Sequence, residues 1–195
     1  MRITWNAPVT LTFAALCAVV YFVPFLSPAM QGSLSGLFVL GDRPNDYLSL
    51  PFYILGHANL EHLTGNMTLF LLLAPNVEER FGSLNLLWMM LITAVATGLL
   101  NMLLFPEGIL GASGIVFMLI ILSSFTNPKG GIPLTFILVA LMYVGKEVVQ
   151  GFQANDVSEF GHILGGILGS LFGFWSAKTR RLPEARPMFD LPKTD

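Results

Sequence analysis

Four polar residues in an otherwise apolar sequence carry side chains that can do chemistry together. Ser113 lies among small residues in ILGASGIVF, and His162 lies in EFGHILGGILG. A serine hydroxyl is a poor nucleophile until a base removes its proton, and a nearby histidine is the commonest base. We therefore interpret Ser113 as a candidate nucleophile and His162 as its general base, in a hydrolysis whose second substrate is water.

His62 and Asn66 can supply the rest of that chemistry. They are four residues apart in EHLTGN, so on a helix they share one face. The oxyanion of acyl transfer needs hydrogen-bond donors that are already in place. We expect these donors to be His62, Asn66 and the backbone N–H of Ser113. No carboxylate stands out as a third member, so a Ser/His dyad is expected. The nearby carboxylates are Glu61, Asp156 and Glu159.

The composition indicates a membrane protein that crosses the bilayer several times. Of 195 residues, 54% are hydrophobic and 11% are charged. The mean hydropathy of +0.69 lies outside the usual range for a soluble domain. A net charge of −2 provides no basic surface, which excludes nucleic-acid binding. Cys17 is the single cysteine, so neither a disulfide nor a thiolate metal site can form within one chain. No cofactor and no metal are expected.

Six apolar runs are long enough to cross a bilayer, for which a helix needs about 20 residues. They cover residues 9–26, 61–77, 84–105, 109–126, 132–149 and 160–177. We predict an all-α fold, a six-helix bundle over residues 1–177, with a disordered tail over 178–195. The first run is interpreted as an uncleaved span rather than a signal peptide. The long connection over 27–60 is rich in turn residues and is expected to pack at the membrane surface.

Lysine and arginine residues predict how these spans are oriented. If the N-terminus is inside, eight basic residues fall on inner segments and two, Arg43 and Lys146, on outer ones. The inner eight are Arg2, Arg80, Lys129, Lys178, Arg180, Arg181, Arg186 and Lys193. This bias favours both termini in the cytoplasm, in a plasma membrane that we expect to be a bacterial inner membrane. The second, fourth and sixth spans then begin on the outer side, near the four polar residues.

The fourth span is expected to be short and recessed. Pro106 and Gly108 discourage helix, so regular structure should begin near Ser113 and last to about Thr126. Fourteen residues rise only about 20 Å, whereas the hydrocarbon layer is about 30 Å thick. Non-helical backbone at that depth must be covered by protein or line a water-filled cavity. Ser113 is therefore predicted to lie in a submerged, wet recess.

Glycines are spaced to let two of these helices approach closely. Gly161, Gly165, Gly169 and Gly173 recur every four residues on the sixth span. Such a stripe is typical of helix packing in membranes. Gly111 and Gly114 can let the turn around Ser113 pack closely in the same way. Docking the fourth helix on this stripe would bring Ser113 and His162 together.

At these residues the sequence resembles the rhomboid intramembrane serine proteases, over residues 9–177. GASG is similar to the family's G-x-S-G, which implies Ser113 as nucleophile. EHLTGN is similar to its H-x-x-x-N, which implies His62 and Asn66 on the oxyanion side, with His57 at an upstream family histidine. GHILGGILG matches A-H-x-x-G-x-x-x-G, except that glycine replaces alanine, and implies His162 as base.

A further motif and one departure complete the resemblance. EERFGS resembles the structural E-x-R-x-G-S that follows the second helix. The matched positions are Glu78, Arg80, Gly82 and Ser83. Rhomboids commonly carry Trp-Arg in the first loop, where this sequence has Leu48 and Ser49. The resemblance implies a six-helix fold and an endopeptidase that cleaves membrane-protein substrates in or near their transmembrane segments.

Three other functions remain open. A noncatalytic relative could bind and retain membrane clients, although this sequence keeps both Ser113 and His162. A proton-coupled transporter could use His62 and His162 as relay groups. A metal site could use His57, His62 and His162, but His57 and His62 would diverge by about 140° on a continuous helix.

Overall fold

The computed structural model describes residues 5–26, 37–41, 46–105, 108–123 and 159–179, with isolated helical positions between 134 and 145. Its helices are α1 (Pro8–Leu26), η1 (Asp46–Ser49), η2 (Tyr53–Leu55), α3 (Leu60–Phe81), α4 (Ser83–Leu104), α5 (Ser113–Ser123) and α7 (Glu159–Thr179). The described residues contain no strand and only one isolated β-bridge, so the predicted all-α class is confirmed for them. Apart from those isolated positions, the predicted 132–149 span lies outside this description, as does the 180–195 part of the tail.

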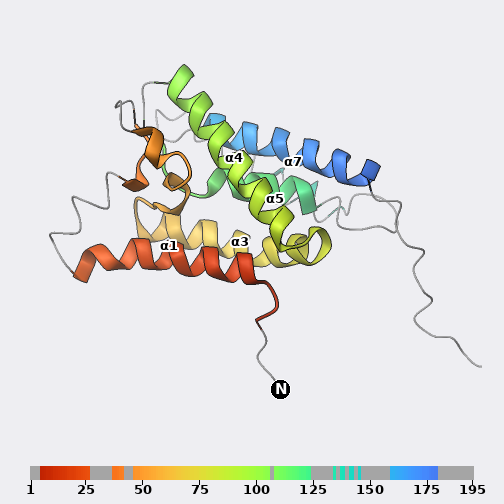
Figure 1. Cartoon of the computed structure of the whole chain (residues 1–195), viewed down its shortest axis with the longest axis horizontal. Helices are drawn as coiled ribbons and strands as arrows, with labels where there is room; N and C mark the ends of the chain where they lie inside the picture. Colours follow the sequence, from red (N-terminus) through yellow and green to blue (C-terminus); the bar gives the residue numbers. More distant parts are fainter. Residues whose placement is uncertain are drawn as a thin grey trace, which may run out of the picture.

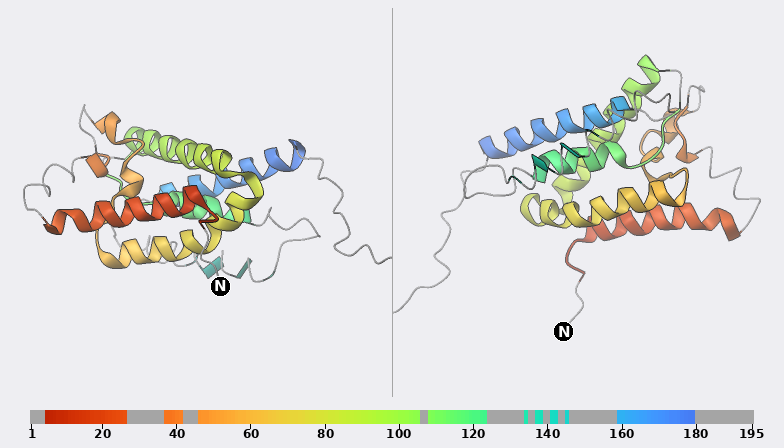
Figure 2. Two further views of the ribbon diagram at one scale, coloured as in Figure 1. Left: turned by 60° about the horizontal axis from the view of Figure 1, so that its bottom comes forward. Right: turned by 180° about the vertical axis from the view of Figure 1, so that it is seen from behind.

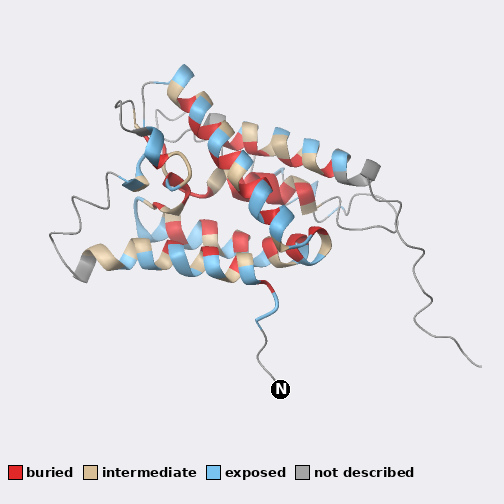
Figure 3. Cartoon of the chain, in the orientation of Figure 1, coloured by how far each residue is buried: buried red, intermediate tan, exposed pale blue. Residues whose placement is uncertain are grey.

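The helices form a bundle around α5. Figures 1 and 2 show α1 beside α3 and α5 beside α7, with α4 crossing over both pairs. α5 is apolar on every side and is buried along most of its length, as Figure 3 shows. A helix without a polar face is stable only where protein or lipid surrounds it. The central position of α5 therefore follows from its sequence.

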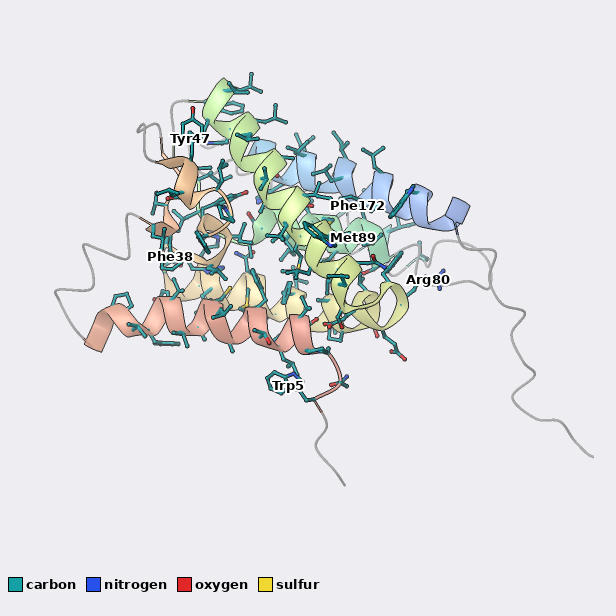
Figure 4. The ribbon with its side chains drawn as sticks, viewed as in Figure 1. Trp5, Phe38, Tyr47, Arg80, Met89 and Phe172 are labelled. Carbon is teal, nitrogen blue, oxygen red and sulfur yellow. The ribbon has the colours of Figure 1, made fainter. Side chains whose placement is uncertain are left out.

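α3, α5 and α7 all begin at the same end of the bundle, where the first connection also lies (Figures 1 and 2). Figure 4 shows Phe38 and Tyr47 of that connection at this end, and Arg80 at the opposite end. The three helix starts that carry the polar residues therefore gather at one end of the molecule. We call this the loop end, defined by residues 37–41, 46–59 and 108–112.

Large apolar side chains cover the outer face of α4. Leu84, Trp88, Ile92 and Leu103 are all exposed there. A contiguous exposed apolar surface marks contact with a membrane or with another protein. Among the described helices, Ser83–Leu104 is the one that is long and apolar enough to cross a bilayer. Shorter apolar stretches occupy Pro8–Pro24, Ser113–Ser123 and Gly161–Gly173, and the count of six spans stays a prediction.

α3 runs four residues beyond the predicted 61–77 and ends at Phe81. Glu78 and Arg80, expected after the second helix, lie inside its last turns. The Glu78 carboxylate is buried and accepts hydrogen bonds from the Val9 N–H, the Thr10 N–H and the Thr10 hydroxyl at 2.9, 2.9 and 2.7 Å. These donors at the start of α1 satisfy the Glu78 carboxylate inside the helix. From the sequence alone, a charged residue at this position suggests a loop.

Candidate active site

α5 begins at Ser113, the residue from which the sequence predicts regular helix. The Ala112 carbonyl accepts the first helical hydrogen bond, from the Val116 N–H at 3.0 Å. Ser113 is half-buried, whereas Ala112 is fully buried. The first N–H groups of a helix have no acceptor within the helix, so they are available to an anion or an oxyanion.

The turn before Ser113 fits only glycine. Gly111 has φ +109°, a conformation that other residues rarely adopt. A Cβ at Gly111 would lie 2.7 Å from both Cε1 and Nε2 of His62, and 3.7 Å from Nδ2 of Asn66. The turn therefore packs directly on the two α3 side chains that were predicted to face the nucleophile.

Asn66 is buried with a free donor. Its side chain is 3% exposed, and its Nδ2 atom has no acceptor among the described residues. An unsatisfied buried donor costs about 1–3 kcal/mol, so native proteins carry few of them. His62 lies one turn earlier, where its backbone N–H is capped by the Asn59 side chain at 2.8 Å. The cap fixes the start of α3 and with it the first turn that carries His62.

His57 and His62 are in contact. Their ring centroids are 5.0 Å apart with the planes at 65°. The 140° divergence expected on one continuous helix does not apply, because His57 precedes α3, which begins at Leu60. His57 Nδ1 lies 3.1 Å from the Leu55 carbonyl oxygen, and Nε2 is buried without a partner in the described part of the chain. Burial first, and then the neighbouring His62, lower the pKa of His57 to about 4.

No described group of three or more His, Cys, Asp or Glu side chains is arranged to hold a metal ion. Among the carboxylates near the histidines, Glu61 is exposed on the first turn of α3. Glu159 is the first residue of α7, and Asp156 lies outside the described residues.

α5 and α7 touch through glycines, as the stripe predicts. A Cβ on Gly165 would collide with the Gly114 carbonyl oxygen. A Cβ on Gly169 would lie 2.5 Å from the Met118 carbonyl oxygen, and one on Gly114 would lie 3.2 Å from the Gly161 carbonyl oxygen. Any side chain at Gly165 or Gly169 would therefore force the two helices apart.

This contact brings the segments around Ser113 and His162 together. Ser113 adjoins Gly114, and His162 adjoins Gly161, the glycine that Gly114 faces. His162 is 4% exposed, and its ring is stacked on Phe117 with centroids 4.6 Å apart and planes at 9°. Phe117 lies one turn after Ser113 on α5, so the same helix carries the serine and supports the imidazole.

Sequence reasoning missed two kinds of residue here. Phe117 was missed because an aromatic residue in an apolar helix looks like ordinary core, although its four-residue spacing from Ser113 was a usable signal. Leu40 was missed because nothing local pairs it with Ile109. The two residues exchange main-chain hydrogen bonds, Leu40 N–H to Ile109 O at 3.0 Å and Ile109 N–H to Leu40 O at 2.7 Å. This pair ties the first connection to the turn before Ser113.

The described residues form a helical domain in which the segments that carry Ser113, His162 and Asn66 come together from three helices. A family model described as the rhomboid domain matches residues 44–179. The chain therefore belongs to the rhomboid family. It is also similar to the rhomboid protease GlpG of Haemophilus influenzae, with 21% identity over 180 residues that cover 89% of this chain and 93% of the relative.

Proposed function

We propose that the chain is an intramembrane serine endopeptidase with Ser113 as nucleophile and His162 as general base. The observation that carries the proposal is the Gly111 turn, which packs on His62 and Asn66 two residues before a serine at a helix start. The buried Asn66 amide, which has no acceptor in the part of the chain that the structure describes, supports the same interpretation, because a donor kept unsatisfied in the ground state can bind charge that develops later.

The proposed reaction proceeds in two halves. Ser113 Oγ attacks the scissile carbonyl carbon while His162 takes the hydroxyl proton, and the oxyanion accepts hydrogen bonds from the Ser113 N–H, Asn66 Nδ2 and His62. His162 then gives its proton to the leaving amine, and an acyl-enzyme remains on Ser113. Water attacks that ester with His162 again as base, which releases the carboxylate product and restores the serine.

The proposed substrates are membrane proteins cleaved in or near a transmembrane segment. A peptide bond inside a helix is shielded by its own hydrogen bonds, so the segment must unwind before it is cleaved. Glycine, proline and polar residues make unwinding cheaper. We expect substrates with such residues in the span to be cleaved faster than substrates with uninterrupted leucine.

The proposed orientation has both termini in the cytoplasm of a bacterial inner membrane. The excess of lysine and arginine on the predicted inner segments supports it. A green fluorescent protein fused to the C-terminus should fluoresce, whereas alkaline phosphatase fused there should be inactive. An active phosphatase fusion would reverse the orientation.

The proposed activity is tested with purified protein in detergent. A fluorophosphonate should label the wild type and a model single-span substrate should be cut, with fragments identified by mass spectrometry. Ser113→Ala and His162→Ala should lose both signals. Ser123→Ala and Ser170→Ala are matched controls, because the hydroxyls of these serines donate hydrogen bonds to the Leu119 and Gly166 carbonyl oxygens of their own helices.

The outcomes separate the remaining functions. Equal cleavage by the wild type and both active-site variants would reject the mechanism. A wild type that is not labelled, yet still captures the span, would identify a noncatalytic client-binding protein. A proton flux into proteoliposomes that survives Ser113→Ala would favour the transporter.

A further inference from the structure

Tyr53 lies in the first connection and is anchored to α4. It begins η2, is 2% exposed, and donates its hydroxyl hydrogen to the Ala94 carbonyl oxygen of α4 at 3.0 Å. Burial raises the pKa of this hydroxyl above its ordinary value, so it stays protonated and remains a donor at any working pH. The hydrogen bond from the Tyr53 hydroxyl therefore fixes the far end of the ring and does not depend on pH.

The ring of Tyr53 rests in a notch on α4. A Cβ on Gly98 would lie 3.2 Å from Tyr53 Cε1, 2.7 Å from Leu50 Cδ2 and 2.8 Å from Leu40 Cδ2. Glycine at this position leaves the space that the three side chains fill. Ala94 precedes Gly98 by one helical turn, so the notch and the hydroxyl acceptor lie on the same face of α4.

The backbone of Tyr53 holds the turn before the proposed nucleophile. Its carbonyl oxygen accepts the N–H of Gly111 at 3.0 Å and also the N–H of Gly56 at 3.1 Å. Gly111 is the residue that packs on His62 and Asn66, two positions before Ser113. One residue thus joins α4 through its side chain to the Gly111 turn through its main chain.

The first connection departs from the family pattern at the positions nearby. Leu48 and Ser49 stand where rhomboids commonly carry Trp-Arg. Leu48 is 72% exposed, so its side chain does not hold the connection against the bundle, whereas Ser49 is buried.

We propose that Tyr53 is a positioning residue for the proposed peptidase site: it fixes the Gly111 turn on α4 and so sets where Ser113 lies relative to His162. This inference rests on the proposed function and adds to it a residue that touches neither substrate nor the reacting atoms. The loss of the anchor should misplace the nucleophile rather than weaken substrate binding. Small misplacements of reacting groups are costly in rate.

The variant Tyr53→Phe removes only the hydroxyl. The concentration of active sites is first titrated with the fluorophosphonate, and kcat and KM are then measured per labelled site. We expect kcat per site to fall about ten- to a hundredfold, with KM changed by less than about twofold. A residue that only supported stability would reduce the number of labelled sites and leave kcat per site unchanged. Tyr47→Phe is the matched control, because Tyr47 is exposed on the same connection (Figure 4).

Hydrogen exchange gives a readout that does not depend on activity. Peptides covering residues 108–112 should exchange faster in Tyr53→Phe than in the wild type, and Tyr47→Phe should match the wild type. If the wild type is not labelled by fluorophosphonate, the proposed function fails, whereas the exchange result still reports whether Tyr53 fixes the turn. Unchanged exchange together with unchanged kcat per site in Tyr53→Phe would overturn the positioning role.

A second variant probes the same contact from α4. Gly98→Ala places a methyl group where Tyr53, Leu40 and Leu50 lie, so it should reproduce the loss of kcat per site and the faster exchange over 108–112. Gly65→Ala is its control, because a Cβ on Gly65 meets nothing within 4 Å. If Tyr53→Phe does not fold, Gly98→Ala decides the question, and wild-type values in that variant would overturn the inference.

Discussion

Asn66 is costly to the folded protein and valuable to the proposed reaction. The variant Asn66→Ala removes a buried donor that has no acceptor in the described residues. We therefore expect kcat to fall about 10²- to 10³-fold. The melting temperature should stay unchanged or rise, because an unsatisfied polar group leaves the interior. Cleavage kinetics and thermal unfolding in detergent measure the two effects.

Asn76→Ala is the control for this prediction. Asn76 is exposed on the same helix, and its side-chain amide reaches the Leu72 carbonyl at 3.5 Å. Its replacement should change neither kcat nor the melting temperature. If Asn66→Ala kept full activity, an oxyanion role for this amide would be excluded.

His57 should make stability depend on pH. Its pKa is about 4 in the folded protein, below the ordinary value of 6.5, so between these values the unfolded chain binds the extra proton. The stabilising contribution of neutral His57 is thus fully present above pH 6.5 and is lost as the pH falls towards 4. The melting temperature of the wild type should fall over this window more than that of His57→Gln. Equal slopes in the two proteins would contradict the lowered pKa.

Residue types and spacing predicted which side chains carry the proposed chemistry, but not what supports them. Ser113, His62 and Asn66 stand out because polar groups are rare in an apolar chain. Phe117 and Tyr53 do not, because aromatic residues are common in any core. Their roles arise from contacts with His162 and Gly111, which are distant in sequence. Only the folded arrangement distinguishes them from ordinary packing residues.

At the scale of helices, the α5–α7 contact should tolerate no side chain at Gly165. In Gly165→Ala the new methyl group meets the Gly114 carbonyl, which is backbone and cannot rotate away. We expect a loss of about 1–3 kcal/mol of stability and much slower fluorophosphonate labelling, because α5 carries Ser113. Thermal unfolding and labelling rates measure both.

Gly166→Ala is the matched control for that contact. It lies on the same helix one residue further on, and its Cβ would meet only Ile121 Cγ1 at 3.8 Å. Because alanine favours helix over glycine, this variant should be as stable as the wild type or slightly more stable. Equal effects at both glycines would mean that helix propensity, and not the close contact, is being measured.

Helix starts were easier to predict than helix ends. Gly108 and the glycine turn make a local break before Ser113, and the four-residue glycine spacing on α7 made its packing face visible. The end of α3 was missed because Glu78, Glu79 and Arg80 look like loop residues. Glu78 remains in the helix because donors at the start of α1, almost 70 positions away, satisfy its carboxylate. No local pattern carries that information.

At the scale of the whole molecule, Glu78 joins the first helix to the rest of the bundle. Glu78→Gln keeps the shape but replaces one acceptor oxygen by a donor and removes the charge. We expect a loss of about 1–3 kcal/mol, since at least one N–H of α1 loses its partner. Glu79→Gln is the control, because Glu79 is exposed beside it. Thermal unfolding of the two variants should differ clearly, and equal melting temperatures would show that the carboxylate does not hold α1.

The starts of α3, α5 and α7 lie together at the loop end, as the predicted alternation of spans requires. Spans that alternate in direction must bring every second start to the same side, so the sequence predicted the common position of the polar residues. The sequence did not predict how the first connection packs. Turn residues identify a loop without saying which helix it rests on, and the notch at Gly98 becomes visible only when its occupants are known.

The bridge between Leu40 and Ile109 consists entirely of peptide groups. Replacing either side chain leaves both main-chain hydrogen bonds intact, so alanine scanning would not detect this link. Distant relatives could keep it with few residues in common. Proline at position 40, which has no N–H to give, would reveal it. Part of what orders the loop end of this protein therefore consists of main-chain hydrogen bonds, which a comparison of side chains does not detect.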